Sequence, residues 1–159
     1  MNSKLDLLEN LQENNSIKVQ LEAKTWKEAI ELCFIPLIEK QVVDKKYVDA
    51  VLENVAKNGP YFIINDYVAL PHAQSDSLVH GVGFSLVTLK NEIYFEKDSR
   101  PIKILIGLAS NSPEIHTSVA LPQIVAVFED QKIIQEIKDS NTKEEILEIL
   151  KKVNLKKYL

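Results

Sequence analysis

A short apolar segment that ends in Pro-His, Val68-Ala69-Leu70-Pro71-His72, places the strongest constraint on how this chain can fold. The apolar run is short enough to be a strand. Pro71 fixes its own φ and favours an extended conformation at Leu70, so the strand is expected to end there. His72 then lies at a strand end on the surface, where a partner can reach it. Because imidazole can be neutral and nucleophilic near pH 7, His72 is a candidate nucleophile. The alternative is that it is simply a turn residue.

Strand-like and helix-like segments alternate along the rest of the chain. Apolar–polar alternation or short apolar runs predict strands at residues 17–21, 61–64, 67–70, 81–90, 93–95 and 101–109, with turns at residues 65–66 and 91–92. Apolar residues at helical spacing predict helices within residues 4–12, 25–37, 44–55, 112–128, 130–137 and 142–153. This interleaving predicts an α/β sandwich, in which helices cover a sheet, built as a single domain over residues 1–159.

Residues that typically start helices precede most of the helical segments. Thr25 and Thr142 each begin a capping box with a glutamate three residues later. Ser112, followed by proline, and the aspartates Asp44 and Asp130 are further predicted caps. Two prolines conflict with this pattern. Pro36 and Pro122 fall inside predicted helices, so each helix must kink or restart there.

Composition excludes several classes of function. The chain has 159 residues, a net charge of −4 and no basic block, which argues against nucleic acid as a partner. The single cysteine, Cys33, excludes an internal disulfide and a Cys-rich zinc site, and its place on an apolar helix face predicts a core residue. The three histidines lack metal-ligand spacing, and no phosphate-binding glycine loop is present, so we expect no metal and no cofactor. Without a signal peptide or a long apolar run, we expect a cytoplasmic protein.

Three motifs carry a resemblance to a known family. They are Gly59-Pro60-Tyr61-Phe62, Ala69-Leu70-Pro71-His72, and the segment from residue 116 to 130 that contains Gln123-Ile124-Val125 and Phe128-Glu129-Asp130. With these motifs the chain resembles the enzyme IIA components of the bacterial sugar phosphotransferase system (PTS), in the mannitol–fructose superfamily, and looks closest to the ascorbate-type branch. The resemblance covers nearly the whole chain. It implies a mixed β-sheet with helices on both faces.

The resemblance also implies a role for two histidines. His72 would accept a phosphoryl group from the phosphohistidine of the carrier protein HPr and pass it to a cysteine of an enzyme IIB partner. His116 would lie beside His72, hydrogen-bond the phosphoryl oxygens and stabilise developing negative charge. The family usually uses the Nε2 nitrogen. His80 has no counterpart in the family pattern, and we predict that it is an exposed loop residue.

The chain departs from its relatives in the cationic residues near the predicted nucleophile. Mannitol-type members carry an arginine upstream of the phosphorylated histidine, whereas the matching region here, residues 55–58, offers only Lys57 nearby. Many members also have an arginine two residues after that histidine, where this chain has Gln74. Gln74 or Ser75 is a candidate hydrogen-bond donor in its place. The first departure favours the ascorbate-type branch.

The leading hypothesis is therefore a phosphoryl carrier of an uptake system for L-ascorbate or a related sugar acid. Its partners would be HPr, enzyme IIB and, indirectly, the membrane enzyme IIC. The alternative is a regulatory module of the same fold, whose phosphorylation state controls a partner protein. Docking requires an exposed apolar patch, for which Leu78, Val79 and Ile115 are candidates, with a place in the core as the alternative. The sequence does not determine which sugar the system transports, nor whether the protein is a monomer or a homo-oligomer.

Overall fold

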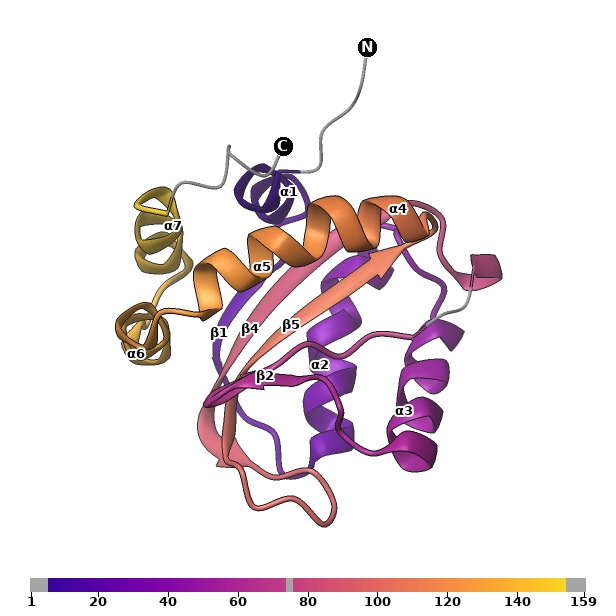
Figure 1. The fold of residues 1–159 in the computed structure, drawn as a ribbon, viewed down its shortest axis with the longest axis horizontal. Coiled ribbons are helices and arrows are strands. Elements are labelled where there is room, and N and C mark those ends of the chain that lie inside the picture. Colours follow the sequence, from indigo (N-terminus) through magenta and orange to yellow (C-terminus); the bar gives the residue numbers. More distant parts are fainter. Residues whose placement is uncertain (1–5, 74–75, 154–159) are drawn as a thin grey trace.

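The computed structural model describes residues 6–73 and 76–153, and its centre is one five-stranded β-sheet. The strands lie side by side in the order β1-β4-β5-β3-β2 (Figure 1). Their bounds are β1 Ile17–Leu21, β2 Ile63–Asn65, β3 Tyr67–Ala69, β4 Val82–Ile93 and β5 Ile102–Ser110. The predicted strands at residues 17–21 and 101–109 and the turn before β3 are confirmed.

The sheet is mixed. β1 pairs parallel with β4, and β3 pairs parallel with β5. β4 and β5 are antiparallel, as are β2 and β3. β5 is buried from Ile104 to Ala109, which agrees with the apolar sequence of that stretch, because a central strand covered on both faces has no solvent side.

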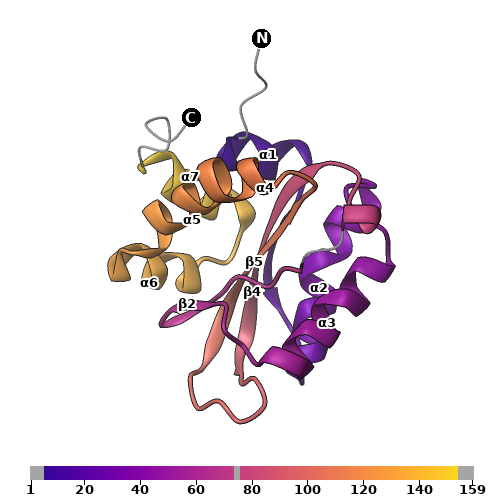
Figure 2. The same cartoon turned by 45° about the vertical axis from the view of Figure 1, so that its right-hand side comes forward.

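Helices cover both faces of the sheet, which confirms the predicted α/β sandwich (Figure 2). α2 and α3 lie on one face, and α1 and α4–α7 lie on the other. The α-helices are α1 Leu7–Glu13, α2 Trp26–Glu39, α3 Lys46–Asn58, α4 Pro113–Ile115, α5 Leu121–Phe128, α6 Gln131–Asp139 and α7 Lys143–Lys151. A short 3₁₀ helix, η1, spans Asp76–Leu78, and a π-helical segment, η2, spans His116–Ala120. The first predicted helix, within residues 4–12, starts before residue 6, so its first residues lie outside the described part of the chain.

Local sequence explains where most helices begin. The hydroxyls of Thr25, Ser112 and Thr142 each accept a hydrogen bond from a first-turn backbone N–H, as predicted. Asp130 does the same for α6 through its carboxylate. Asp44 accepts from the N–H of Lys46 at 2.9 Å and so caps α3 from one residue further upstream.

The two prolines inside predicted helices are accommodated differently. Pro36 lies buried within α2, which continues to Glu39. Pro122 stands in the first turn of α5, directly after the π-helical segment η2. Proline has no N–H to donate to the preceding turn, and the wider π turn just before it lets the helical path run on past the proline.

One predicted turn is wrong. Residues 91–92 do not reverse the chain, because β4 continues through them to Ile93, with a shift in register between Thr88 and Ile93. The chain turns after Phe95 instead, where the N–H of Asp98 bonds the Phe95 carbonyl at 3.1 Å. β4 pairs with β5 on both sides of this stretch, at Thr88 and at Ile93, so the strand runs on through residues whose side chains favour turns.

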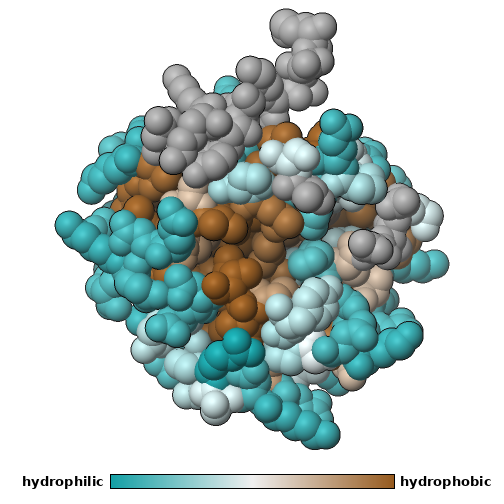
Figure 3. All heavy atoms as spheres, viewed as in Figure 1, coloured by the Kyte–Doolittle hydropathy of each residue, from teal (hydrophilic) through white to brown (hydrophobic). Residues whose placement is uncertain are grey.

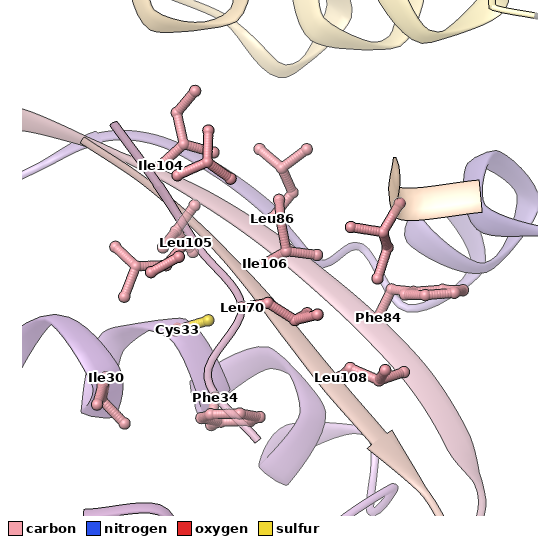
Figure 4. Packing of buried hydrophobic residues seen from close by; sticks show 14 of the residues in the cluster. Ile30, Cys33, Phe34, Leu70, Phe84, Leu86, Ile104, Leu105, Ile106 and Leu108 are labelled. Atoms are coloured by element: carbon pink, nitrogen blue, oxygen red, sulfur yellow. The ribbon is translucent and has the colours of Figure 1, made fainter. Parts of the chain in front are cut away.

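The core between α2 and the sheet is closely packed (Figure 4). Cys33 is fully buried there, as predicted, and burial raises the pKa of its thiol to about 12. Gly107 in β5 is required by this packing, because a Cβ at that position would lie 2.3 Å from the Ser85 hydroxyl and 3.0 Å from the Cys33 sulfur. Among the described residues, no helix is long and apolar enough to cross a membrane.

Candidate functional site

His72 lies just beyond the end of β3, as the Leu-Pro-His sequence predicts. The backbone N–H of Leu70 bonds the Phe62 carbonyl at 2.9 Å, which ties this segment to the chain before β2. The ring of His72 is half-buried, and its Nδ1 lies 2.8 Å from the Leu70 carbonyl. A carbonyl oxygen can only accept, so Nδ1 carries the proton and Nε2 holds the free electron pair. A contact two residues away in sequence thus selects the tautomer.

The structure brings His116 beside His72. The two ring centroids are 5.3 Å apart with an angle of 48° between the planes. His116 begins the π-helical segment η2, and its own N–H bonds the Ser112 carbonyl at 3.0 Å. Ser112 and Pro113 start the short helix before it, so the helix start that the sequence predicts is what places His116 at the end of β5.

Both histidines are biased toward the neutral form. The pKa of His72 is lowered chiefly by burial, against the opposing effect of its hydrogen bond to Leu70. The pKa of His116 is lowered by burial and then by the charge that His72 would carry. Two rings this close resist simultaneous protonation. At neutral pH His72 is therefore a neutral imidazole with an available Nε2.

Aromatic side chains flank the other side of His72. The Tyr61 ring meets the His72 ring edge-on with centroids 5.9 Å apart, and the Phe62 ring lies at 6.3 Å. Phe62 is buried, whereas Tyr61 is 57% exposed. The Gly-Pro-Tyr-Phe motif thus places one aromatic residue under the histidine and another at its solvent edge. Gly59 adopts φ of +77° to end α3, a conformation that suits glycine.

A polar groove of about 520 Å³ opens next to His72, between α3 and Tyr61. Asn54 lines this groove, and its amide donates to the Tyr61 hydroxyl at 2.8 Å and to the His72 carbonyl at 3.4 Å. Asn58 donates to the Asn54 side-chain oxygen at 2.7 Å. Lys57 also lines the groove. It lies in the region where mannitol-type members carry an arginine. Gln74 and Ser75, the other candidates, lie outside the described residues.

Sequence reasoning missed Asn54. Its signal was available, because Asn54 and Asn58 stand four residues apart on the polar face of a helix, where side chains contact each other. The predicted inward positions of α3, such as Val51 and Val55, fix which face points to solvent and therefore where Asn54 must lie. Tyr61 belongs to the Gly-Pro-Tyr-Phe motif, but the sequence alone assigned it no separate role.

The predicted apolar patch differs in composition from the observed one. Val79 is 4% exposed and pairs with Val43, so it belongs to the core, while Leu78 and Ile115 are partly buried. The exposed large apolar residues on the described surface include Tyr61, Val125 and Ile64. Figure 3 shows apolar residues gathered over α5 and toward β2. These two elements are joined by the Asn65 amide, which donates to the Phe128 carbonyl at 2.7 Å.

The third histidine and the acidic residues are candidate metal ligands. His80 is exposed in a loop, as predicted, although its backbone N–H bonds the Val42 carbonyl at 2.8 Å. Within residues 6–73 and 76–153, no three His, Cys, Asp or Glu side chains come together in an arrangement that could hold a metal ion.

Comparison with known families shows to which family the chain belongs. The family model of the phosphoenolpyruvate-dependent sugar phosphotransferase system, EIIA 2, matches residues 10–153. The chain belongs to this family. It is therefore an EIIA component, a phosphotransferase that carries a phosphoryl group in a sugar PTS.

Relatives match this EIIA over nearly its whole length. The ascorbate-specific PTS EIIA component of Mycoplasma pneumoniae is 44% identical over 157 residues, which cover 99% of each chain. The protein of the same name from Escherichia coli K12 is 37% identical over 151 residues, covering 94% of this chain and 98% of the relative. A Streptococcus mutans protein named as a PTS IIA has a crystal structure with a TM-score of 0.91 at 39% identity, covering 98% of this chain and 99% of that one.

A more distant structure shares the fold. Enzyme IIA of the E. coli mannitol system, solved in complex with phosphorylated enzyme IIB, has a TM-score of 0.75 at 20% identity and covers 94% of this chain and 98% of its own. At this identity the likeness concerns the fold alone.

Proposed function

We propose that this EIIA accepts a phosphoryl group on Nε2 of His72 from phospho-HPr and passes it to a cysteine of its cognate enzyme IIB. The observation that carries the proposal is the 2.8 Å contact between Nδ1 of His72 and the Leu70 carbonyl. It fixes the proton on Nδ1 and leaves Nε2, at the other side of the ring, as the nucleophile. The lowered pKa of His72 keeps that nitrogen unprotonated at neutral pH.

The transfer can be written as an in-line exchange. The electron pair of Nε2 attacks phosphorus and forms the new nitrogen–phosphorus bond. At the same time the nitrogen–phosphorus bond of phospho-HPr breaks, and its electron pair stays on the histidine of HPr. In the second step, a cysteine thiolate of enzyme IIB attacks, a sulfur–phosphorus bond forms and the bond to Nε2 breaks. The proton on Nδ1 stays in its bond to Leu70 throughout. Such transfers depend mainly on positioning and on stabilisation of the equatorial oxygens.

His116 is the proposed group that stabilises those oxygens. Its ring is close enough to that of His72 for an N–H to donate to a phosphoryl group on Nε2. The arriving negative charge favours a protonated His116 and opposes the depression of its pKa in the resting protein. The group therefore gains donor strength when phosphate is present.

The polar groove offers a second set of donors. Asn54 is held in place by Asn58 and Tyr61, and Lys57 adds a positive charge in a chain whose only arginine, Arg100, is bonded to Asp98 far along the sequence. We propose that Lys57 supplies part of the charge stabilisation that arginine gives in mannitol-type members, while Asn54 holds the groove in shape beside it. A lysine is a mobile point charge, so this contribution is less directional than an arginine's.

The surface around His72 suits transient docking. Exposed Tyr61 adjoins the histidine, and the apolar surface over α5, with Val125 half exposed, offers a patch rimmed by polar groups. We propose that HPr and enzyme IIB use this face in turn, in the cytoplasm, with the membrane enzyme IIC served through IIB. The mannitol enzyme IIA of E. coli, which forms a complex with phosphorylated IIB, supports this assignment of the acceptor.

L-Ascorbate or a related sugar acid is the proposed substrate of the complete system. The support is the name shared by the M. pneumoniae and E. coli relatives, both ascorbate-specific, at 44% and 37% identity. The carrier itself does not bind the sugar in this scheme, so the cognate IIB is the component that links it to one substrate.

The test is phosphoryl transfer in a purified mixture of phosphoenolpyruvate, enzyme I, HPr and this protein, followed by intact mass. We expect a gain of one acid-labile phosphoryl group in the wild type and none in His72→Ala. The exposed His80 provides the matched control, because His80→Ala removes an imidazole of the same chemistry from a loop outside the site. A phosphoryl group retained in His72→Ala would refute the assignment. Addition of the ascorbate-type IIB should then discharge the wild type, and failure to do so would refute the proposed acceptor.

A further inference from the structure

Tyr47 is a buried residue of α3 whose hydroxyl reaches the segment that carries His72. Only 1% of its surface is exposed, and its ring packs edge-on against Phe34 with centroids 5.4 Å apart. The sequence predicts only that Tyr47 is one of the inward-facing residues of an amphipathic helix. A buried phenol must, however, satisfy its O–H group, and the partners that it finds here are backbone groups on two other elements.

The hydroxyl of Tyr47 meets three backbone groups. It accepts from the N–H of Ala73 at 3.0 Å. It also lies 3.1 Å from the Ala73 carbonyl and 3.2 Å from the Leu108 carbonyl. One hydroxyl has a single proton, so it donates to one of these carbonyls at a time while it accepts from Ala73. Burial raises the pKa of Tyr47 to about 12, so that proton is present at neutral pH.

These contacts stand where the β-ladder ends. The last pair between β3 and β5 is Ala69 with Leu105. Pro71, two residues later, has no N–H to donate. The Tyr47 hydroxyl instead joins Ala73, the residue after His72, to Leu108 near the end of β5. Since β5 leads through Ser112 and α4 to the segment η2 that begins with His116, the hydroxyl connects the supports of both histidines.

We propose that Tyr47 is a positioning residue for phosphoryl transfer, whose hydroxyl holds residues 71–73 against the end of β5 and so fixes His72 relative to His116. Its part in the reaction rests on the proposed function of His72. The local bond from Nδ1 to Leu70 orients the ring, and the amide of Asn54 holds the His72 carbonyl. Tyr47 adds the attachment to the sheet that neither of them provides.

The hydroxyl can be separated from the ring. Tyr47→Phe keeps the aromatic packing on Phe34 and removes only the bonds to Ala73 and Leu108. Ser16→Ala is the matched control. Ser16 is fully buried and its hydroxyl donates to the Phe84 carbonyl at 2.6 Å, but it precedes β1, which β4 and β5 separate from β3. Both variants lose one buried hydroxyl that bonds backbone.

Two measurements on the full-length protein test the role. The first is the single-turnover rate of phosphoryl acceptance against phospho-HPr concentration, and the second is the ¹⁵N NMR spectrum of the His72 ring. For Tyr47→Phe we expect the rate at saturating phospho-HPr to fall about tenfold or more, because small displacements of a reacting group are costly, while the half-saturating concentration stays within about twofold. The His72 ring signals should shift or broaden. Ser16→Ala should change neither.

A saturating rate for Tyr47→Phe within about twofold of that of Ser16→Ala would overturn the proposal. Failure of the wild type to accept a phosphoryl group would instead refute the function proposed for His72, and the ring spectrum would then decide the role of Tyr47 alone. In that case, His72 signals that move in Tyr47→Phe and not in Ser16→Ala support positioning, and unchanged signals overturn it.

Discussion

Removal of the His116 imidazole is the perturbation that bears most directly on the paired-histidine arrangement. In His116→Ala the ring 5.3 Å from His72 is lost, while the nucleophile keeps its bond to Leu70. His116 is partly exposed at the start of a helical segment, so truncation should leave the core intact. We expect His72 to remain able to accept a phosphoryl group, but more slowly, and onward transfer to be slowed as well.

The size of the effect follows from the kind of contact that is lost. A hydrogen bond to a charged group contributes about 1.5–3 kcal/mol. Because roughly 1.4 kcal/mol corresponds to a factor of ten in rate, the loss predicts a decrease of about tenfold to about a hundredfold. His116 is only half-buried, so we expect the decrease in rate to stay within this range. A fully enclosed donor would give a larger loss.

The assay is rapid-quench measurement of phosphoryl acceptance from phospho-HPr, followed by discharge to IIB. His80→Ala controls for the loss of an imidazole elsewhere on the surface. His116→Gln, which restores an N–H donor without a titratable charge, should recover part of the rate. Acceptance and discharge by His116→Ala at rates within about twofold of wild type would refute the stabilising role, because so small a change is far below the energy of one such bond.

Three further predictions concern the pH dependence of the acceptance rate, the pH dependence of stability, and packing. Because the pKa values of His72 and His116 are lowered from 6.5, the acceptance rate should stay level down to that pH and fall only below it; a midpoint of the rate profile above 6.5 would contradict the neutral-imidazole assignment. Just below pH 6.5 the unfolded chain binds more protons at these histidines than the folded protein does. The free energy of unfolding should therefore decrease as pH falls below 6.5. Denaturant titrations at several pH values should show a weaker decrease in His72→Gln than in the wild type. Separately, Gly107→Ala should lower the free energy of unfolding by about 1–3 kcal/mol, because its Cβ meets the Ser85 hydroxyl and the Cys33 sulfur. Gly81→Ala, where nothing lies within 4 Å, is the control, and equal denaturation midpoints for the two variants would contradict this account.

The predictions that succeeded depend on short stretches of chain. The caps at Thr25, Ser112 and Thr142 need only a hydroxyl and a backbone N–H three residues later. The end of β3 just before Leu70-Pro71 follows from the geometry of proline, and the burial of Cys33 follows from helical spacing. The turn predicted at residues 91–92 failed because β4 pairs with β5 at Thr88 and again at Ile93, and these flanking pairs outweigh the local preference of polar residues for turns.

The sequence by itself determined the position of His72 at a strand end, because proline, strand length and helix caps act within a few residues. The family resemblance added His116. Only the tertiary structure decided that the two rings lie 5.3 Å apart, that Asn54 contacts the backbone of His72, and that the hydroxyl of Tyr47 joins Ala73 to Leu108. These contacts depend on the order of strands in the sheet and on how α3 packs against it, and no local pattern specifies which distant backbone groups a buried side chain will meet.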